Sequence, residues 1–96
     1  MPHYFLKLNP CRPTFAQDMT DAERVIMQQH VAYWEDLMSK GMVVVYGPVF
    51  DPNGAYGIGV VEADDEGRLK ELIKNDPATT INNYEYYQMR AIVPGK

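Results

Sequence analysis

Apolar positions recur at helical spacing across the centre of the first half of the chain. They follow the i, i+3, i+4, i+7 pattern that lines one face of a helix. The residues on this stripe are Met27, His30, Val31, Trp34, Leu37 and Met38. A histidine inside an apolar stripe has limited access to solvent, so its protonation near neutral pH depends on burial and on any carboxylate partner.

Both ends of this helix are marked in the sequence. Thr20 is followed three residues later by Glu23, which is the spacing of a capping box. At the other end, Lys40 places a positive charge near the last carbonyl groups, and Gly41 can adopt a left-handed conformation. The pattern therefore predicts one long helix between Thr20 and Gly41.

Runs of β-branched and aromatic residues predict four strands. They cover His3–Leu8, Met42–Tyr46, Ala55–Glu62 and Tyr84–Val93. The second has almost no polar residue, which is typical of a strand buried on both faces. In the third, Gly57 and Gly59 leave one face as bare backbone that a bulky group can approach. Asn53-Gly54 predicts a hairpin turn between the second and third strands. A second helix is predicted from Asp64 or Asp65 to Asn75.

The order strand, helix, strand, strand, helix, strand predicts an α+β, ferredoxin-like βαββαβ sandwich. This fold is a four-stranded antiparallel sheet with two helices on one face. The other sheet face has no cover within the chain, although the second and fourth strands carry apolar or aromatic residues on both sides. A large exposed apolar patch is unusual in a monomer, so we expect a homodimer formed through the sheet. The seven tyrosines suit such an interface, because a phenol offers apolar area and a hydrogen-bonding tip.

Length and composition predict a single domain over residues 1–96, since 46% of the residues are hydrophobic and 23% are charged. A net charge of −4 gives no general attraction to phosphate backbones or anionic lipids, so we expect no nucleic-acid partner and no membrane partner. Cys11 is the single cysteine, and no leader pattern is recognisable, so we expect a cytoplasmic protein. No metal-ligand spacing or phosphate-binding glycine loop is present, and we expect no metal and no cofactor.

His30 is the strongest candidate for chemistry. A histidine on an apolar face is often a structural core residue, but packing of the helix on the sheet places it within reach of the loop that holds Asp76. A carboxylate hydrogen-bonded to imidazole orients the ring and supports general acid–base catalysis. Asp76 also fits a plain turn former between Asn75 and Pro77. Asp51 is the alternative partner, and the sequence does not decide between the two.

Four other residues are candidates for a binding pocket. Arg12, near the end of the first strand, is a candidate for holding a substrate carboxylate, although such an arginine is more often a surface charge. The apolar pocket walls are expected from Phe15, Trp34 and Tyr46. Cys11 is a weak candidate nucleophile, because no histidine neighbours it in sequence.

In fragments spread over nearly its whole length, the chain resembles the YciI-like, or YCII-related, family. The fragments are Arg12-Pro13-x-Phe15, Gln29-His30-Val31-x-Tyr33-Trp34, Gly47-Pro48-Val49, Tyr56-Gly57-Ile58-Gly59 and Asn75-Asp76-Pro77-Ala78. The resemblance implies a dimeric α/β-barrel assembly with a cleft centred on a histidine and an aspartate, which here are His30 and Asp76. It also implies reactions such as dehydrochlorination or isomerisation of small oxygenated ring compounds.

The sequence therefore favours a small-molecule enzyme of lyase, isomerase or dehydrochlorinase type, with His30 and Asp76 in acid–base roles within a homodimer. The alternative is a non-catalytic dimeric module that binds a small ligand or a protein. RNA binding through sheet tyrosines is disfavoured, because the basic surface and the glycine–aromatic motif of RNA-binding domains are missing.

Overall fold

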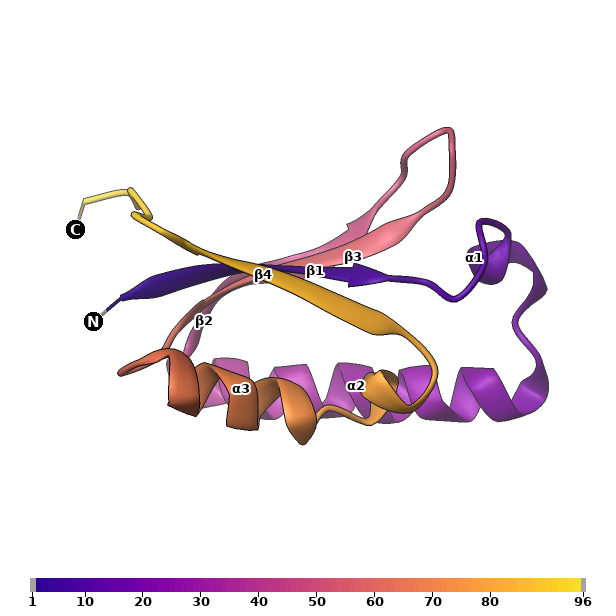
Figure 1. The fold of residues 1–96 in the computed structure, drawn as a ribbon, viewed down its shortest axis with the longest axis horizontal. Coiled ribbons are helices and arrows are strands. Elements are labelled where there is room, and N and C mark those ends of the chain that lie inside the picture. The colour runs from indigo at the N-terminus through magenta and orange to yellow at the C-terminus, as the bar shows by residue number, and fades with distance from the viewer. Residues whose placement is uncertain (1, 96) are drawn as a thin grey trace.

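The computed structural model describes residues 2–95 and shows the predicted α+β, ferredoxin-like fold (Figure 1). All strand pairs are antiparallel, and the strand order in the sheet is β2-β3-β1-β4. The strands are β1 (His3–Asn9), β2 (Val43–Val49), β3 (Tyr56–Glu62) and β4 (Asn83–Met89). The helices are α1 (Phe15–Asp18), α2 (Asp21–Ser39), α3 (Glu66–Lys74) and the short 3₁₀ helix η1 (Pro77–Thr80). Figure 1 shows α2 and α3 beneath the same face of the sheet, and the Tyr33 hydroxyl of α2 donates to the Leu72 carbonyl of α3 at 2.6 Å.

Local sequence signals set the helix ends as predicted. The Thr20 hydroxyl accepts from the Glu23 backbone N–H at 3.1 Å, and a Glu23 carboxylate oxygen accepts from the Thr20 N–H at 2.9 Å. Gly41, just after the C-cap of α2, has a positive φ of 78°. Asp65 caps α3 by accepting from the Arg68 backbone N–H at 2.8 Å. These contacts satisfy backbone groups that a helix leaves unpaired at its ends.

The core lies between the sheet and the two long helices. In β1 the buried residues alternate with partly exposed ones, as a strand with one covered face requires. The apolar core cluster is formed by Tyr4, Leu6, Trp34, Leu37, Val43, Val61, Ala63, Leu69 and Leu72. In β4, Tyr84 and Tyr86 lie on the covered face, because they pair with Leu8 and Leu6 and pack toward the helices.

The bare backbone of β3 is where Trp34 approaches the sheet. A Cβ placed on Gly59 would lie 2.5 Å from the Trp34 ring, which is closer than real contacts allow. At Gly57, on the same face, a Cβ would meet Leu8 at an ordinary 3.5 Å. The close approach predicted from the glycines is thus made by the indole of Trp34.

The prediction that β2 is buried on both faces is wrong for the single chain. Only Val43 is buried in this strand, while Val44 is 40% exposed and Val45 is 49% exposed. The pairing of β2 with β3 shifts between Val43 and Val45, and the outer face of the sheet has no covering layer within the described residues. Val44 and Val45 are therefore left exposed in the single chain, whereas Val43 and Tyr46 pack toward the helices.

Several element boundaries also differ from the prediction. β2 continues to Val49, three residues beyond the expected end at Tyr46. β4 ends at Met89, four residues before the expected end at Val93. The proline-containing loop after β1 includes the short helix α1, which begins at Phe15. The first and last residues of the predicted 1–96 domain lie outside the described residues. Within residues 2–95, no helix is long and apolar enough to cross a membrane.

Candidate functional site

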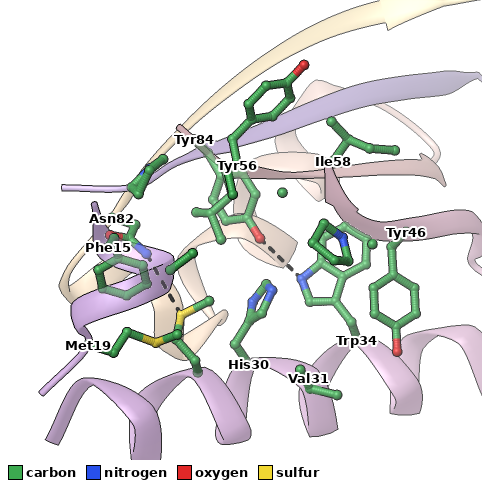
Figure 2. Close-up of a pocket in the computed structure, with 18 residues that line it drawn as sticks. Phe15, Met19, His30, Val31, Trp34, Tyr46, Tyr56, Ile58, Asn82 and Tyr84 are labelled. Carbon is green, nitrogen blue, oxygen red and sulfur yellow. Dashed lines mark hydrogen bonds between the residues drawn. The ribbon is translucent and has the colours of Figure 1, made fainter. Parts of the chain in front are cut away.

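Two elements bring His30 and Asp76 together. His30 lies in the middle of α2, on the side that faces the sheet (Figure 2). Asp76 follows α3 and caps η1, where its Oδ1 accepts from the Ala78 backbone N–H at 2.9 Å. Pro77 at the start of η1 has no N–H to satisfy, which suits the first position of a helix. Asp76 is therefore both the turn former and the nearest carboxylate to the histidine.

The His30 imidazole contacts the Asp76 carboxylate through one nitrogen. Nδ1 lies 2.9 Å from Oδ1 and 2.9 Å from Oδ2. The side chain of His30 is 14% exposed and that of Asp76 is 1% exposed. The carboxylate is thus sealed from solvent, whereas the imidazole has limited access to it.

Three further donors surround Asp76. The indole Nε1 of Trp34 donates to Oδ2 at 2.8 Å, and the Tyr84 hydroxyl makes a short hydrogen bond to the same oxygen. Burial alone raises the pKa of Asp76, but the hydrogen bonds from His30 and Tyr84, the charge of His30 and the Ala78 N–H together lower it below its ordinary value. Asp76 is therefore ionised at neutral pH and accepts from every donor around it.

An ionised Asp76 determines the tautomer of neutral His30. Because the carboxylate only accepts, Nδ1 must carry the proton, and Nε2 is left with its lone pair. Among residues 2–95, no hydrogen bond to Nε2 is present. The imidazole therefore presents a bare, basic nitrogen on the side away from Asp76.

Tyr84 remains a donor to this carboxylate. Burial, followed by the charge of Asp76 and the hydrogen bond to it, raises the pKa of Tyr84 above its ordinary value. The phenol also accepts from Trp34 Nε1 at 3.2 Å. Trp34 and Tyr84 thus hydrogen-bond to each other and to Asp76, and they occupy the Asp76 oxygens together with His30. The imidazole of His30 has one nitrogen in this network and also lines the cavity.

A cavity of about 250 Å³ lies beside His30, between the sheet, α2 and the α1 segment (Figure 2). Its walls are mostly apolar. The lining residues are Leu8, Pro10, Phe15, Ala16, Met19, Met27, His30, Val31, Trp34, Tyr46, Gly47, Pro48, Ala55, Tyr56, Gly57, Ile58, Asn82 and Tyr84. An apolar cavity of about 150 Å³ is enough for benzene, so this cavity has room for one substituted ring.

The structure places three of the four predicted pocket residues at the cavity. Phe15, Trp34 and Tyr46 line it, and the rings of Trp34 and Tyr46 lie 5.5 Å apart between centroids. Tyr56 also belongs to the lining, but Figure 2 shows its hydroxyl pointing away from the cavity, beyond the sheet.

Arg12 is not among the residues that line the cavity. Its Nε donates to Asp18 at 2.7 Å, and its two terminal nitrogens donate to Glu23 at 3.0 and 2.8 Å. The hydrogen bonds from Arg12 and the Thr20 backbone lower the pKa of Glu23 to about 2. The structure therefore does not support the substrate-binding role suggested for Arg12, because its guanidinium already holds two carboxylates of its own chain.

The other two candidates lie apart from His30. Asp51 accepts from the Asn53 backbone N–H at 2.8 Å and so stabilises its own turn. Cys11 is exposed, and the nearest polar contact of its Sγ is with Arg12 at 3.5 Å. Within the described part of the chain, no cluster of three histidine, cysteine or acidic residues is arranged to hold a metal ion.

Sequence reasoning missed two polar residues of the cavity, Tyr84 and Asn82. The alternation along β4 placed Tyr84 on one face of the strand, but no local pattern indicates its bond to Asp76. Asn82 lies in a polar stretch that carries no recognisable site pattern, yet it is 4% exposed and lines the cavity. Both lie far in sequence from His30, so only the folded chain shows that they share a site.

Two solved structures are similar to this chain over almost its whole length. 5-Chloro-2-hydroxyhydroquinone dehydrochlorinase (TftG) from Burkholderia phenoliruptrix AC1100, in complex with 2,5-dihydroxybenzoquinone, has a TM-score of 0.65 and 21% identity, covering 91% of this chain and 93% of that chain. An antibiotic biosynthesis monooxygenase has a TM-score of 0.52 and 11% identity, covering 95% of this chain and 99% of that chain. At these identities the likeness shows the shared fold.

Comparison with curated protein sequences gives no match. The YCII-related domain, in contrast, matches residues 5–93, which include all four strands except the first two residues of β1 and contain both His30 and Asp76. The resemblance seen in the sequence fragments is thereby confirmed, and the chain belongs to the YCII-related domain family.

Proposed function

We propose that this protein is an enzyme that transfers a proton on a small, largely apolar ring compound, without a cofactor. His30 acts as the base and then as the acid, and Asp76 holds it in place. The observation that carries the proposal is the bare Nε2 of a carboxylate-held histidine beside an apolar cavity. That arrangement is what general acid–base catalysis near neutral pH requires.

The proposed step begins with a proton leaving a substrate hydroxyl, or a C–H next to a carbonyl, for Nε2 of His30. The bonding electrons remain on the substrate as an enolate or phenolate. The imidazolium that forms is stabilised by the negative charge of Asp76, which does not itself take the proton. In an isomerisation, His30 returns the proton to a different substrate atom. In an elimination, the substrate anion expels a leaving group together with its electron pair, and His30 gives up the proton to that group or to water.

The walls of the cavity favour an uncharged ring as the substrate. Phe15, Trp34 and Tyr46 offer aromatic surface, and neither lysine nor arginine is among the described lining residues. A carboxylate or phosphate would lose its hydration there without gaining a cation. The ring ligand named for TftG, 2,5-dihydroxybenzoquinone, supports a small oxygenated ring as the class of compound.

We also propose that the protein is a homodimer formed through the outer face of the sheet. Apolar residues on or next to this face are strongly exposed in the single chain, including Phe50 at 84% and Tyr87 at 57%. Burial of such area in a second copy is favourable by about 25 cal/mol per Å². Analytical ultracentrifugation should give a dimer for the wild type and a shift toward monomer for Val45→Lys. A wild-type monomer at all concentrations would contradict this assembly.

The catalytic proposal is tested by hydrogen exchange on a ring substrate. Hydroxyhydroquinone is incubated with the protein in D₂O without oxygen, and NMR follows replacement of its ring protons by deuterium. This exchange needs a proton to move between oxygen and ring carbon, as in the proposed step. We expect the wild type to accelerate it, and His30→Ala to reduce the acceleration by roughly 10²–10⁴-fold.

His3→Ala is the matched control, because the same substitution is made at the other histidine of the chain, which pairs with Glu62 on the sheet. Circular dichroism establishes that both variants are folded. Equal exchange rates for wild type and His30→Ala would overturn the catalytic role of His30. Ring binding without any accelerated exchange would favour the alternative, a non-catalytic ligand-binding module.

A further inference from the structure

Asn82 is a buried polar residue that the proposed proton transfer does not use. It lies between η1 and β4, and only 4% of its surface is exposed. Its backbone N–H donates to the Ala78 carbonyl at 2.9 Å, which fixes the residue at the end of η1. A buried amide side chain is costly unless its donors and acceptors are satisfied, so its contacts indicate what it is for.

The orientation of the Asn82 amide follows from its neighbours. Oδ1 accepts from the Cys11 backbone N–H at 3.0 Å. The reversed amide would set its NH₂ group against that N–H donor, so the oxygen must face Cys11. Nδ2 therefore points toward the cavity side, where Met27 Sδ lies 3.8 Å away (Figure 2).

Within residues 2–95, the N–H groups of this amide have only one weak hydrogen-bond acceptor. Nδ2 carries two N–H bonds, and the thioether of Met27 is a weak acceptor for one of them. Among residues 2–95, the second N–H has no acceptor. Asn82 is thus a nearly buried donor, anchored at its oxygen, beside an otherwise apolar cavity.

We propose that Asn82 Nδ2 is a substrate-binding donor that selects ring compounds carrying an uncharged carbonyl oxygen in addition to the group that meets His30. This inference rests on the proposed function of the cavity and names its second polar contact. Met27, whose Sδ lies 3.8 Å from Asn82 Nδ2, is three residues before His30 on α2, so Met27 and His30 lie on neighbouring turns of one helix face. Asn82 and His30 both line the same cavity. The cavity of about 250 Å³ has room for one ring that contacts both groups.

A neutral donor suits this role because the negative charge that forms on the substrate needs support in a cavity without lysine or arginine. When His30 takes the proton, electron density moves to the carbonyl oxygen, and a hydrogen bond to that oxygen strengthens. Asn82 therefore favours a substrate whose hydroxyl or acidic C–H is conjugated with the carbonyl group that it holds.

The test compares two probes of similar shape, para-hydroxyacetophenone and para-isopropylphenol. The first carries a carbonyl oxygen, conjugated with its hydroxyl, where the second carries a methyl group. Their affinities for the wild type and for Asn82→Leu are measured by NMR titration at millimolar concentration. We expect the substitution to lower the affinity ratio of the carbonyl probe to the alkyl probe by about threefold to tenfold, the usual worth of one hydrogen bond. The ratio cancels any general weakening of the cavity.

Two variants separate the binding role of Asn82 from its structural role. Asn82→Asp keeps an oxygen that accepts from Cys11 N–H but has no NH₂ group, so it should lower the ratio as Asn82→Leu does. Met27→Leu removes the thioether and keeps Asn82, so the ratio should stay the same or rise. An unchanged ratio in both Asn82 variants would overturn the role of Asn82 while leaving that of His30 standing. Failure of the wild type to bind either probe would overturn both.

Discussion

The His30–Asp76 pair and the Arg12 cluster, which consists of Arg12, Asp18 and Glu23, both join basic nitrogens to carboxylates near α2. They differ in whether the fold leaves a nitrogen free to contact a ligand. His30 contacts Asp76 through Nδ1 alone and keeps Nε2 beside the cavity. In Arg12, Nε and both terminal nitrogens are bonded to oxygens of its own chain. A charged or polar residue can serve a ligand only when the fold leaves one of its groups unoccupied.

The two regions also differ in burial. The Asp76 side chain is 1% exposed, whereas in the Arg12 cluster Glu23 is 16% exposed and Asp18 is 52% exposed. Ion pairs in water are screened and contribute little, while a buried carboxylate that loses its partners is costly. We therefore expect the His30–Asp76 region to dominate both stability and chemistry, and the Arg12 cluster to fix the position of the α1 segment.

The largest expected effect is that of Asp76→Ala. It leaves the Nδ1–H of His30, the Trp34 indole and the Tyr84 hydroxyl without their acceptor, and we expect a loss of about 3 kcal/mol or more in the free energy of unfolding. Asp18→Ala is the matched control and should change stability far less. Urea denaturation measures both. Equal losses would show that burial of the carboxylate does not distinguish the two regions.

A smaller effect is expected from Gly59→Ala, which adds a methyl group against the Trp34 ring. The ring cannot easily move, because its Nε1 is held by Asp76, so we expect a loss of about 1–3 kcal/mol from overpacking. Gly57→Ala, in the same strand and on the same face, meets Leu8 at an ordinary distance and should cost less. If thermal melts give the same loss for both, the contact of Trp34 with β3 does not position the site.

How far the sequence predicts this molecule depends on the range of each interaction. The capping box of Thr20 and Glu23, the helix end at Gly41 and the strand that begins at His3 are predicted from local patterns, and the structure confirms them. The fold follows from the order of such elements. Arg12 is a case that local patterns do not predict. Its position in the sequence does not reveal that Asp18 and Glu23 accept hydrogen bonds from its guanidinium.

The composition of a site depends on contacts between distant segments. Asn82 and Tyr84 share a site with His30 only because the β1–β4 pairing and η1 bring residues 82–84 against α2. For β2, the apolar run predicts burial on both faces, but such a run is equally typical of a strand that has one uncovered face. A sequence therefore indicates that a strand face is apolar, but it does not indicate which element or which second copy covers that face.

The smallest expected effect concerns acid stability at the Arg12 cluster. The pKa of Glu23 is lowered from 4.5 to about 2, so its ionised form is favoured by folding. This contribution is fully present above the unfolded pKa and is lost as the pH falls from about 4.5 to 2. Glu23→Gln keeps a capping-box side chain but cannot titrate. Urea denaturation at pH 7, about 4 and about 3 should show a shallower acid loss for the variant, and parallel profiles would contradict the pairing.

The central claim is that neutral His30 carries its proton on Nδ1, against Asp76, and presents a bare Nε2 to the cavity. Nitrogen NMR of the imidazole in ¹⁵N-labelled protein reports the tautomer directly. The account predicts the Nδ1–H form for His30 in the wild type, with a slowly exchanging Nδ1 proton. A ring protonated on Nε2, or one that interconverts between both tautomers, would contradict it, because the nitrogen assigned as the base would then carry a proton.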